Sequence, residues 1–266
     1  MSRLATLGLL AGLIVVGSAN AQRPAGPAAP ADPRSRAPVD LTGYWVAVVT
    51  EDWRYRMMTP DKGDFTGVAL NAAGRALMQK WDPSKDQSSG EACRAYGAAA
   101  IMRTPTRLHI TWQDASTLKV ETDAGEQTRV LNFAGAPAHD LAPSWQGYSM
   151  AQWEGLRARG GFGGVTAGLP TTAGLAGAPP PTQDGYLKVM TTQLRPGYLR
   201  KNGVPYGANT SVEEYFDSFH EPNGDTWLVV TSIVNDPEYL DQPFITSSQF
   251  KKTDAAKWNP TPCQAK

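Results

Sequence analysis

Apolar and polar residues alternate with a period of two along much of this chain, as they do in β-strands that bury one face. In the stretch RLHITWQ, residues 107–113, every second side chain from Leu108 to Trp112 is apolar, and the side chains between them are polar. Turn residues separate the stretches with this pattern, which together predict about eight or nine strands. The predicted strands are residues 41–50, 107–113, 118–122, 127–133, 148–154, 186–194, 211–220, 226–234 and 244–251.

Turn and helix signals complete the predicted fold. The dipeptide Asn223-Gly224 is a strong hairpin signal between two of these strands. One short helix is predicted at Asn71–Trp81 with Asn71 as its N-cap, either covering one end of a barrel or packing outside it. Residues 90–102 fit a helix or a loop equally well. The pattern as a whole predicts an all-β fold, an antiparallel meander that closes into a β-barrel, with a β-sandwich as the alternative.

The first predicted strand carries a short motif. Its sequence LTGYW, residues 41–45, places Gly43 two residues before Trp45. This arrangement resembles the opening of lipocalin-like barrels, in which the tryptophan of a Gly-x-Trp motif closes the base of the barrel. The resemblance implies a lipocalin-like β-barrel, and the alternative is that Trp45 is an ordinary aromatic residue of the core.

The N-terminal residues have the pattern of a secretory signal peptide. Arg3 precedes an apolar run, residues 4–16, and Ala19-Asn20-Ala21 forms a small-x-small cleavage site. The predicted organisation is a signal peptide at 1–21, a disordered linker at 22–38, and a single β domain at 39–266 with a disordered Gly/Pro-rich insertion at 157–184. We therefore expect an exported, periplasmic or extracellular protein without a transmembrane segment in its mature chain.

Export changes how the two cysteines are interpreted. An oxidising compartment permits disulfides, so Cys93 and Cys263 are expected to pair, and the bond would tie the proline-rich tail WNPTPC to the rest of the domain. The alternative is two free thiols, one of them acting as a nucleophile. Neither cysteine has a histidine nearby in the sequence, so the structural bond is the preferred interpretation.

Charge and histidine content exclude several kinds of partner. The chain has 25 basic and 25 acidic residues, so no net field would concentrate nucleic acid on it. Its three histidines, His109, His139 and His220, are each isolated, and no metal-binding spacing is present. We predict no nucleic-acid partner, no metal and no cofactor.

The predicted strands nevertheless place some polar groups where they could act together. Glu213 and Glu214 are adjacent in a strand and must point to opposite faces, so an inward Glu214 would need Arg129, Arg54 or a ligand as its partner. His109 could form an acid–base group with Glu121 and Arg129, although a solvated outer face is the simpler interpretation.

Two further segments are candidates for recognition. The aromatic residues Trp53 and Tyr55 alternate with arginines in EDWRYRMM, and they either line a pocket or belong to an amphipathic strand that leaves the barrel. The segment RPGYLRKNGVPY, residues 195–206, combines arginine, lysine and tyrosine. It could hold an anionic or polar group, or it could be a solvated turn.

A second resemblance covers the chain from about Leu41 to the C-terminus. The motifs SWQGYSMAQWEG, YLKVMTT, NGVPYG, SVEEYFDSFH and DTWLVVTSIVNDPEYLDQPF are similar in order to those of an uncharacterised group of exported bacterial proteins found often in soil bacteria. The group has no established activity. The resemblance implies export and a β architecture, and it transfers no catalytic residue.

Three functions are compatible with these observations. The preferred hypothesis is a non-catalytic barrel that binds a small, partly apolar molecule. The second is an enzyme, of hydrolase or isomerase type, with a His/carboxylate pair inside the barrel, and the third is a structural or protein-binding module of the cell envelope. No catalytic residue is assigned, and the oligomeric state stays open. The predicted ligand-binding residues are Trp53, Tyr55, His109, Trp112, Arg129, Glu214 and Trp227.

Overall fold

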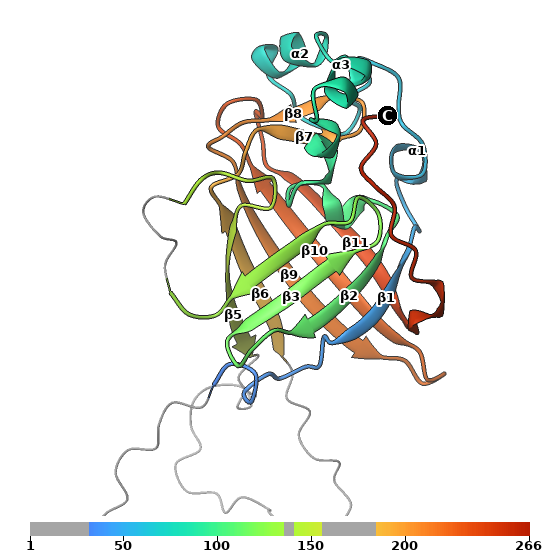
Figure 1. The fold of residues 1–266 in the computed structure, drawn as a ribbon, viewed down its shortest axis with the longest axis vertical. Helices are drawn as coiled ribbons and strands as arrows, with labels where there is room; N and C mark the ends of the chain where they lie inside the picture. The colour runs from blue at the N-terminus through green and yellow to red at the C-terminus, as the bar shows by residue number, and fades with distance from the viewer. Residues whose placement is uncertain (1–31, 136–140, 156–184) are drawn as a thin grey trace, which may run out of the picture. The chain divides into compact units, whose positions relative to one another are not determined.

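The computed structural model describes residues 32–135, 141–155 and 185–266. Nine strands of this part form one closed barrel in the order β1-β11-β10-β9-β6-β5-β4-β3-β2 (Figure 1). The predicted barrel is therefore confirmed, and each predicted strand is present within a few residues of its expected bounds. The barrel strands are β1 (Gly43–Val48), β2 (Arg107–Trp112), β3 (Thr117–Thr122), β4 (Thr128–Asn132), β5 (Tyr148–Gly155), β6 (Gly185–Thr192), β9 (Ser211–His220), β10 (Thr226–Asn235) and β11 (Phe244–Thr253).

One pair of neighbouring strands, β4 and β5, is parallel rather than antiparallel. An odd number of strands cannot alternate in direction all the way around a closed ring, so a nine-stranded barrel must contain at least one parallel pair. The parallel pairing joins Leu131 with Ser149 and Asn132 with Met150. The meander is thus antiparallel everywhere except at this junction.

The interior of the barrel is filled by side chains that alternate along each strand. On β2, Leu108 and Ile110 point inward and are fully buried, as the period-two pattern predicts. Trp45 of the Gly-x-Trp motif is also completely buried, and its indole nitrogen donates to the carbonyl of Leu41 at 2.9 Å. Further buried interior residues come from the remaining strands: Leu118, Val120, Leu131, Ala151, Leu187, Val189, Phe216, Leu228, Val230 and Phe250.

Aromatic rings occupy the end of the barrel near the start of the domain. Trp112, Phe133 and Trp153 pack together, with ring centres 5.4 Å apart for Trp112–Phe133 and for Phe133–Trp153. The indole of Trp153 donates to the carbonyl of Pro33 at 2.8 Å. Residues 32–38, the described part of the predicted linker, therefore lie against this end of the barrel (Figure 1).

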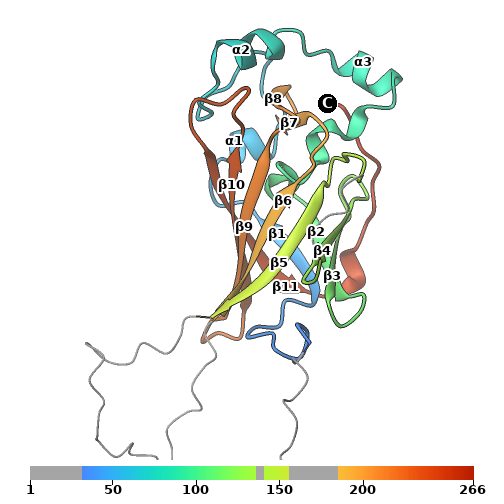
Figure 2. The ribbon, with the colours of Figure 1, turned by 90° about the vertical axis from the view of Figure 1, so that its left-hand side faces the viewer.

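Short helices and a hairpin cover the opposite end of the barrel (Figure 2). The predicted helix is confirmed as α2 (Ala72–Met78), which ends three residues earlier than expected, and its N-cap Asn71 accepts from the backbone N–H of Gly74 at 2.9 Å. We call these elements, with the segments that join them, the cap. The other cap elements are α1 (Trp53–Arg56), α3 (Pro83–Ser88), the 3-10 helices η1 (Ala92–Tyr96) and η2 (Ile101–Arg103), and the strands β7 (Gly197–Arg200) and β8 (Val204–Tyr206).

Two parts of the cap differ from the simpler interpretations of the sequence. The alternating segment that contains Trp53 and Tyr55 is the helix α1 and not a strand that leaves the barrel. The segment 195–206 contains the hairpin β7–β8, whose strands are largely buried, and it is not a solvated turn. In both cases a pattern of a few residues could not distinguish the local structures.

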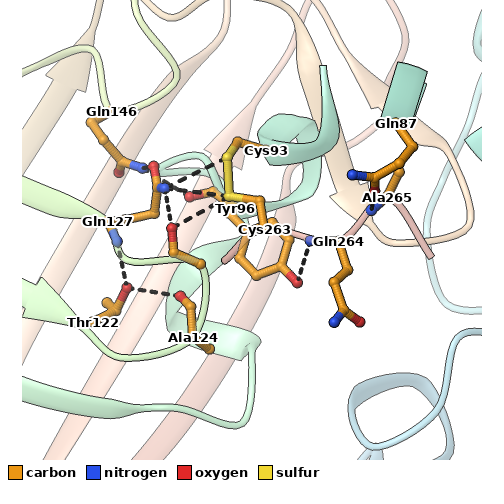
Figure 3. The surroundings of a disulfide bond; sticks show 11 residues. Gln87, Cys93, Tyr96, Thr122, Ala124, Gln127, Gln146, Cys263, Gln264 and Ala265 are labelled. Atoms are coloured by element: carbon orange, nitrogen blue, oxygen red, sulfur yellow. Dashed lines mark hydrogen bonds between the residues drawn. A yellow bond between two sulfur atoms is a disulfide. The ribbon is translucent and has the colours of Figure 1, made fainter. Parts of the chain in front are cut away.

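The predicted disulfide is confirmed and joins the C-terminal tail to the cap. Cys93 of η1 bonds to Cys263, with their Cα atoms 5.1 Å apart (Figure 3). The tail also pairs with the turn after β3, because the backbone N–H of Thr261 donates to the carbonyl of Asp123 and that of Gly125 donates to Thr261, each at 2.8 Å. A short 3-10 helix, η3 (Ala255–Lys257), precedes this tail.

Several predictions made from the sequence concern residues outside the described ranges. These are the predicted signal peptide at 1–21, the first part of the linker, the insertion from 157 to 184, and His139. Among the residues that are described, no helix has the length and apolar character needed to cross a membrane.

A half-buried tyrosine, Tyr198, connects the hairpin to α3. The hydroxyl of Tyr198 donates to Asp86 at 2.9 Å, and Arg94 contacts both residues, at 3.0 Å from Asp86 and 3.1 Å from the Tyr198 oxygen. Burial and the hydrogen bond to Asp86 raise the pKa of Tyr198 to about 12.

This raised pKa predicts an alkaline loss of stability. The folded protein keeps the Tyr198 proton at a pH where the unfolded chain, with a tyrosine pKa of about 10, has released it. The free energy of unfolding should therefore fall as the pH rises from about 10 to about 12. Urea unfolding at steps across this range should give a steeper fall for the wild type than for Tyr198→Phe, and equal slopes would contradict the prediction.

Candidate functional site

Two of the predicted site residues, Arg129 and Glu214, form an ion pair inside the barrel. Both side chains are fully buried, and Arg129 Nη1 lies 3.0 Å from Glu214 Oε1. Thr191 and Ser232 contact the pair from neighbouring strands, at 3.3 Å from Arg129 and 3.4 Å from Glu214. An inward Glu214 does require a cationic partner, as the strand pattern indicated, and the protein itself supplies it.

The other predicted site residues do not join this pair. His109 lies on the outer face of β2, where its ring stacks on Tyr44 at 4.1 Å and its Nδ1 lies 3.2 Å from Glu121. Trp112 belongs to the aromatic cluster at the other end of the barrel. Trp227 alternates with the inward-facing Leu228 and so points outward from β10. The structure therefore does not bring all these residues to one interior site, because the register turns His109 and Trp227 outward and Trp112 lies at the other end of the barrel.

A cavity of about 350 Å³ lies in the cap instead. Tyr55 is the predicted site residue that lines it, while its helix neighbour Trp53 is 62% exposed. Residues from α1, η1, η2, the β7–β8 hairpin and the C-terminal tail form its walls. The cavity-lining residues include Tyr55, Arg56, Met57, Met58, Tyr96, Arg103, Leu199, Arg200, Lys201, Thr261, Pro262 and Gln264.

Arg56 is the most unusual residue of this cavity. Its side chain is 8% exposed, and its Nε donates to the carbonyl of Arg103 at 2.9 Å. The two terminal nitrogens, Nη1 and Nη2, are buried and have no hydrogen-bond partner among the described residues. A buried charged donor without an acceptor destabilises the folded protein, because it has lost its hydrogen bonds to water and forms none within the protein.

Other cations line the same cavity and are incompletely neutralised. Arg103 lies 3.3 Å from Asp52, whose side chain is about half exposed. Arg200 donates from Nη1 to the carbonyl of Thr66 at 2.8 Å, but its Nε is buried and unpaired in the described structure. Lys201 adds a fourth positive group. The cavity thus collects more positive than negative charge.

The pKa values of these arginines reflect the same crowding. Burial, together with the positive charge of Arg103, lowers the pKa of Arg56. The same two causes, in the same order, lower the pKa of Arg200. Arginine stays charged at physiological pH even so, because its ordinary pKa is far above 7. The cavity therefore holds positive charges that its own acidic neighbours neutralise only in part.

Aromatic and apolar side chains complete the walls. The guanidinium carbon of Arg200 lies 4.4 Å from the centre of the Tyr55 ring, and Lys201 Nζ lies 4.9 Å from that of Tyr96. Such contacts orient the cations over the ring faces. Met57, Met58 and Leu199 add apolar surface. The arrangement suits a molecule with one negatively charged end and an apolar body.

No protein-family model, curated protein or solved structure matches this chain. Within residues 32–135, 141–155 and 185–266, no group of three or more histidine, cysteine, aspartate or glutamate side chains is arranged to hold a metal ion.

Sequence reasoning identified part of this cavity and missed the rest. Tyr55 was predicted as a pocket residue, and Arg200 and Lys201 belong to the segment 195–206 that was considered for binding an anionic group. Arg56 was one of the arginines of EDWRYRMM considered for a pocket, but its contact with Arg103 was not predicted, and Arg103 itself was not singled out. They lie 47 residues apart and meet only through the hydrogen bond between the Arg56 side chain and the Arg103 backbone, which no local pattern reveals.

Proposed function

We propose that this protein is a non-catalytic barrel that binds a small, partly apolar anion in the cavity of the cap. The observation that carries the proposal is the buried guanidinium of Arg56, whose two terminal nitrogens lack any acceptor in the described structure. A carboxylate, sulfate or phosphate group would accept from these nitrogens and offset their desolvation. Arginine suits this role because its planar donors match such groups in pairs.

The remaining walls favour an apolar body on the same ligand. The cavity volume of about 350 Å³ is in the range of small-molecule sites. The rings of Tyr55 and Tyr96 and the side chains of Met57 and Met58 provide contact area without further charge. These groups supply binding and orientation, which supports a binding function in preference to catalysis.

The cap is a better location for the ligand than the barrel interior. Side chains from all nine strands fill the interior, and the charges of Arg129 and Glu214 already satisfy each other there. The barrel then acts as a rigid support, a role common for scaffolds whose loops carry recognition. The disulfide between Cys93 and Cys263 supports our expectation that the protein is exported, because such bonds persist in oxidising compartments.

Replacing Arg56 with methionine tests the proposal through two opposite effects. Arg56→Met should weaken the binding of cyclohexanecarboxylate, a ring with one carboxylate, roughly tenfold to a hundredfold, because a hydrogen-bonded charge pair is lost. The same variant should raise the free energy of unfolding of the unliganded protein by about 1 to 3 kcal/mol, since it removes a buried charged group whose two terminal nitrogens have no partner. Calorimetric titration and urea unfolding measure the two effects.

Arg54→Met provides a matched control on the same helix. The Arg54 side chain is 66% exposed and its closest carboxylate oxygen, on Asp64, is 3.7 Å away. This variant should change neither the affinity nor the stability appreciably. If Arg56→Met bound the carboxylate as tightly as the wild type, or if the wild type did not bind it, the proposed anion site would be wrong.

A further inference from the structure

A second cavity, of about 270 Å³, lies on the other side of the β7–β8 hairpin. Its walls come from α2, α3, η1 and the hairpin, and it shares no lining residue with the anion cavity described above. The side chains of Leu77, Trp81, Tyr198, Pro205, Tyr206 and Tyr239 provide most of its apolar surface. The hairpin therefore has a cavity on each side.

The charged groups of this second cavity are balanced. Lys80, Lys85 and Arg94 face Asp82, Asp86 and Glu91, three positive and three negative residues.

Most of the acids already have partners. Arg94 lies 3.0 Å from Asp86 and 3.1 Å from Glu91, while Asp82 caps α3 by accepting from the backbone N–H groups of Ser84 and Lys85 at 3.0 and 3.2 Å. The positive and negative residues of these walls are equal in number, in contrast to the excess of positive charge in the anion cavity.

Two neutral polar groups in these walls are unsatisfied. The indole Nε1 of Trp81 is buried and has no acceptor among the described residues, and the residue is 9% exposed. The hydroxyl of Tyr206 is also buried and unpartnered, with the residue 1% exposed. Buried polar groups of this kind are normally hydrogen-bonded, and an indole N–H can only donate. Both groups call for an oxygen acceptor that the described chain does not provide.

We infer that the second cavity binds an uncharged ring compound that carries an oxygen acceptor, such as a ketone, ether or alcohol. The ring would pack among the aromatic and proline side chains, and its oxygen would accept from Trp81 Nε1 or the Tyr206 hydroxyl. The inference rests on different residues from the proposed anion site, so either can fail without the other.

The indole N–H signal of Trp81 reports directly on this hydrogen bond. The chain has 8 tryptophans, and the spectrum of Trp81→Phe, which lacks one indole signal, identifies the signal of Trp81. Titration with cyclohexanone should move this signal downfield along a saturating curve, because the N–H gains an acceptor. Should Trp81→Phe not fold, contacts between the indole and the protons of Gly203, which packs against the ring, assign the signal in the wild type.

Matched probes and variants separate the two cavities. Cyclohexanecarboxylate has the same ring with a negative charge and should leave the Trp81 signal in place, whereas Arg56→Met should leave the cyclohexanone titration unchanged. Tyr206→Phe should weaken cyclohexanone binding severalfold. A Trp81 signal that does not move up to the solubility limit of cyclohexanone, or that moves equally with the carboxylate, would overturn the inference.

Discussion

Removal of the Cys93–Cys263 disulfide is expected to lower the free energy of unfolding by about 4 to 5 kcal/mol, because the bond closes a very long loop and restricts the unfolded chain. The two cysteines are 170 residues apart in the sequence. For a domain of this size, such a loss corresponds to a decrease in Tm of roughly 10 to 20 °C. Urea and thermal unfolding of Cys93→Ser/Cys263→Ser beside the oxidised wild type measure the difference.

The same change should weaken binding in the anion cavity. Thr261, Pro262 and Gln264 form one wall of that cavity and flank Cys263 in the tail. Without the disulfide, the tail keeps its hydrogen bonds to the turn after β3, to the Tyr96 hydroxyl, which accepts from the backbone N–H of Gln264 at 3.4 Å, and to Gln87, which accepts from that of Ala265 at 3.2 Å (Figure 3). Dithiothreitol should reproduce the effect in the wild type and leave the double variant unaffected. A double variant that unfolds at the wild-type urea concentration would contradict the prediction.

Replacement of Glu214 with leucine should be the most destabilising change inside the barrel. The substitution would leave the Arg129 guanidinium buried without a counter-charge, which costs about 3 to 5 kcal/mol. Both side chains have zero exposure, so water cannot replace the lost carboxylate. The loss should appear as a lower urea midpoint for Glu214→Leu.

Two further variants give this prediction a sharp control. Arg129→Met/Glu214→Leu removes both charges and should recover much of the stability, since replacing a buried pair by apolar residues is often close to neutral. The preceding residue of β9, Glu213, points outward and pairs with Lys188 at 2.8 Å in a solvated position. Glu213→Gln should cost less than about 1 kcal/mol. The losses of unfolding free energy in Arg129→Met and Glu214→Leu should add up to more than the loss in the double variant. If they add up to the loss in the double variant, the two residues are not coupled.

The strands of the barrel could be predicted from the sequence because each strand has one face in the core. A period of two then appears directly in the residues, as in Leu108 and Ile110 of β2. The closed order, the parallel pair and the filling of the interior could not be predicted in the same way. They depend on which strands meet, and the residues of one strand carry little information about its neighbour.

The cap was much less predictable. Its elements are short: α1 has 4 residues and β8 has 3, too few for a period to be recognised. The helix α2 was found because it has both an apolar face and the N-cap Asn71. In the candidate site, Arg129 was one of the three partners named for an inward Glu214, beside Arg54 and a ligand, and the structure selects Arg129. Arg56 was considered with its neighbours as a pocket residue, but its lack of a partner could not be predicted, because it is a property of the folded protein alone.

The parallel junction between β4 and β5 gives the ring of strands a built-in asymmetry. Only two residue pairs join these strands, Leu131 with Ser149 and Asn132 with Met150, whereas β9 and β10 are joined along ten. Near the two ends of the domain, β1 closes the ring by pairing with both β11 and β2. The pairing between β4 and β5 is the shortest in the ring. Arg129 and Ser149 lie beside this junction, so the buried ion pair of the barrel is close to the place where the ring is held by the fewest residue pairs.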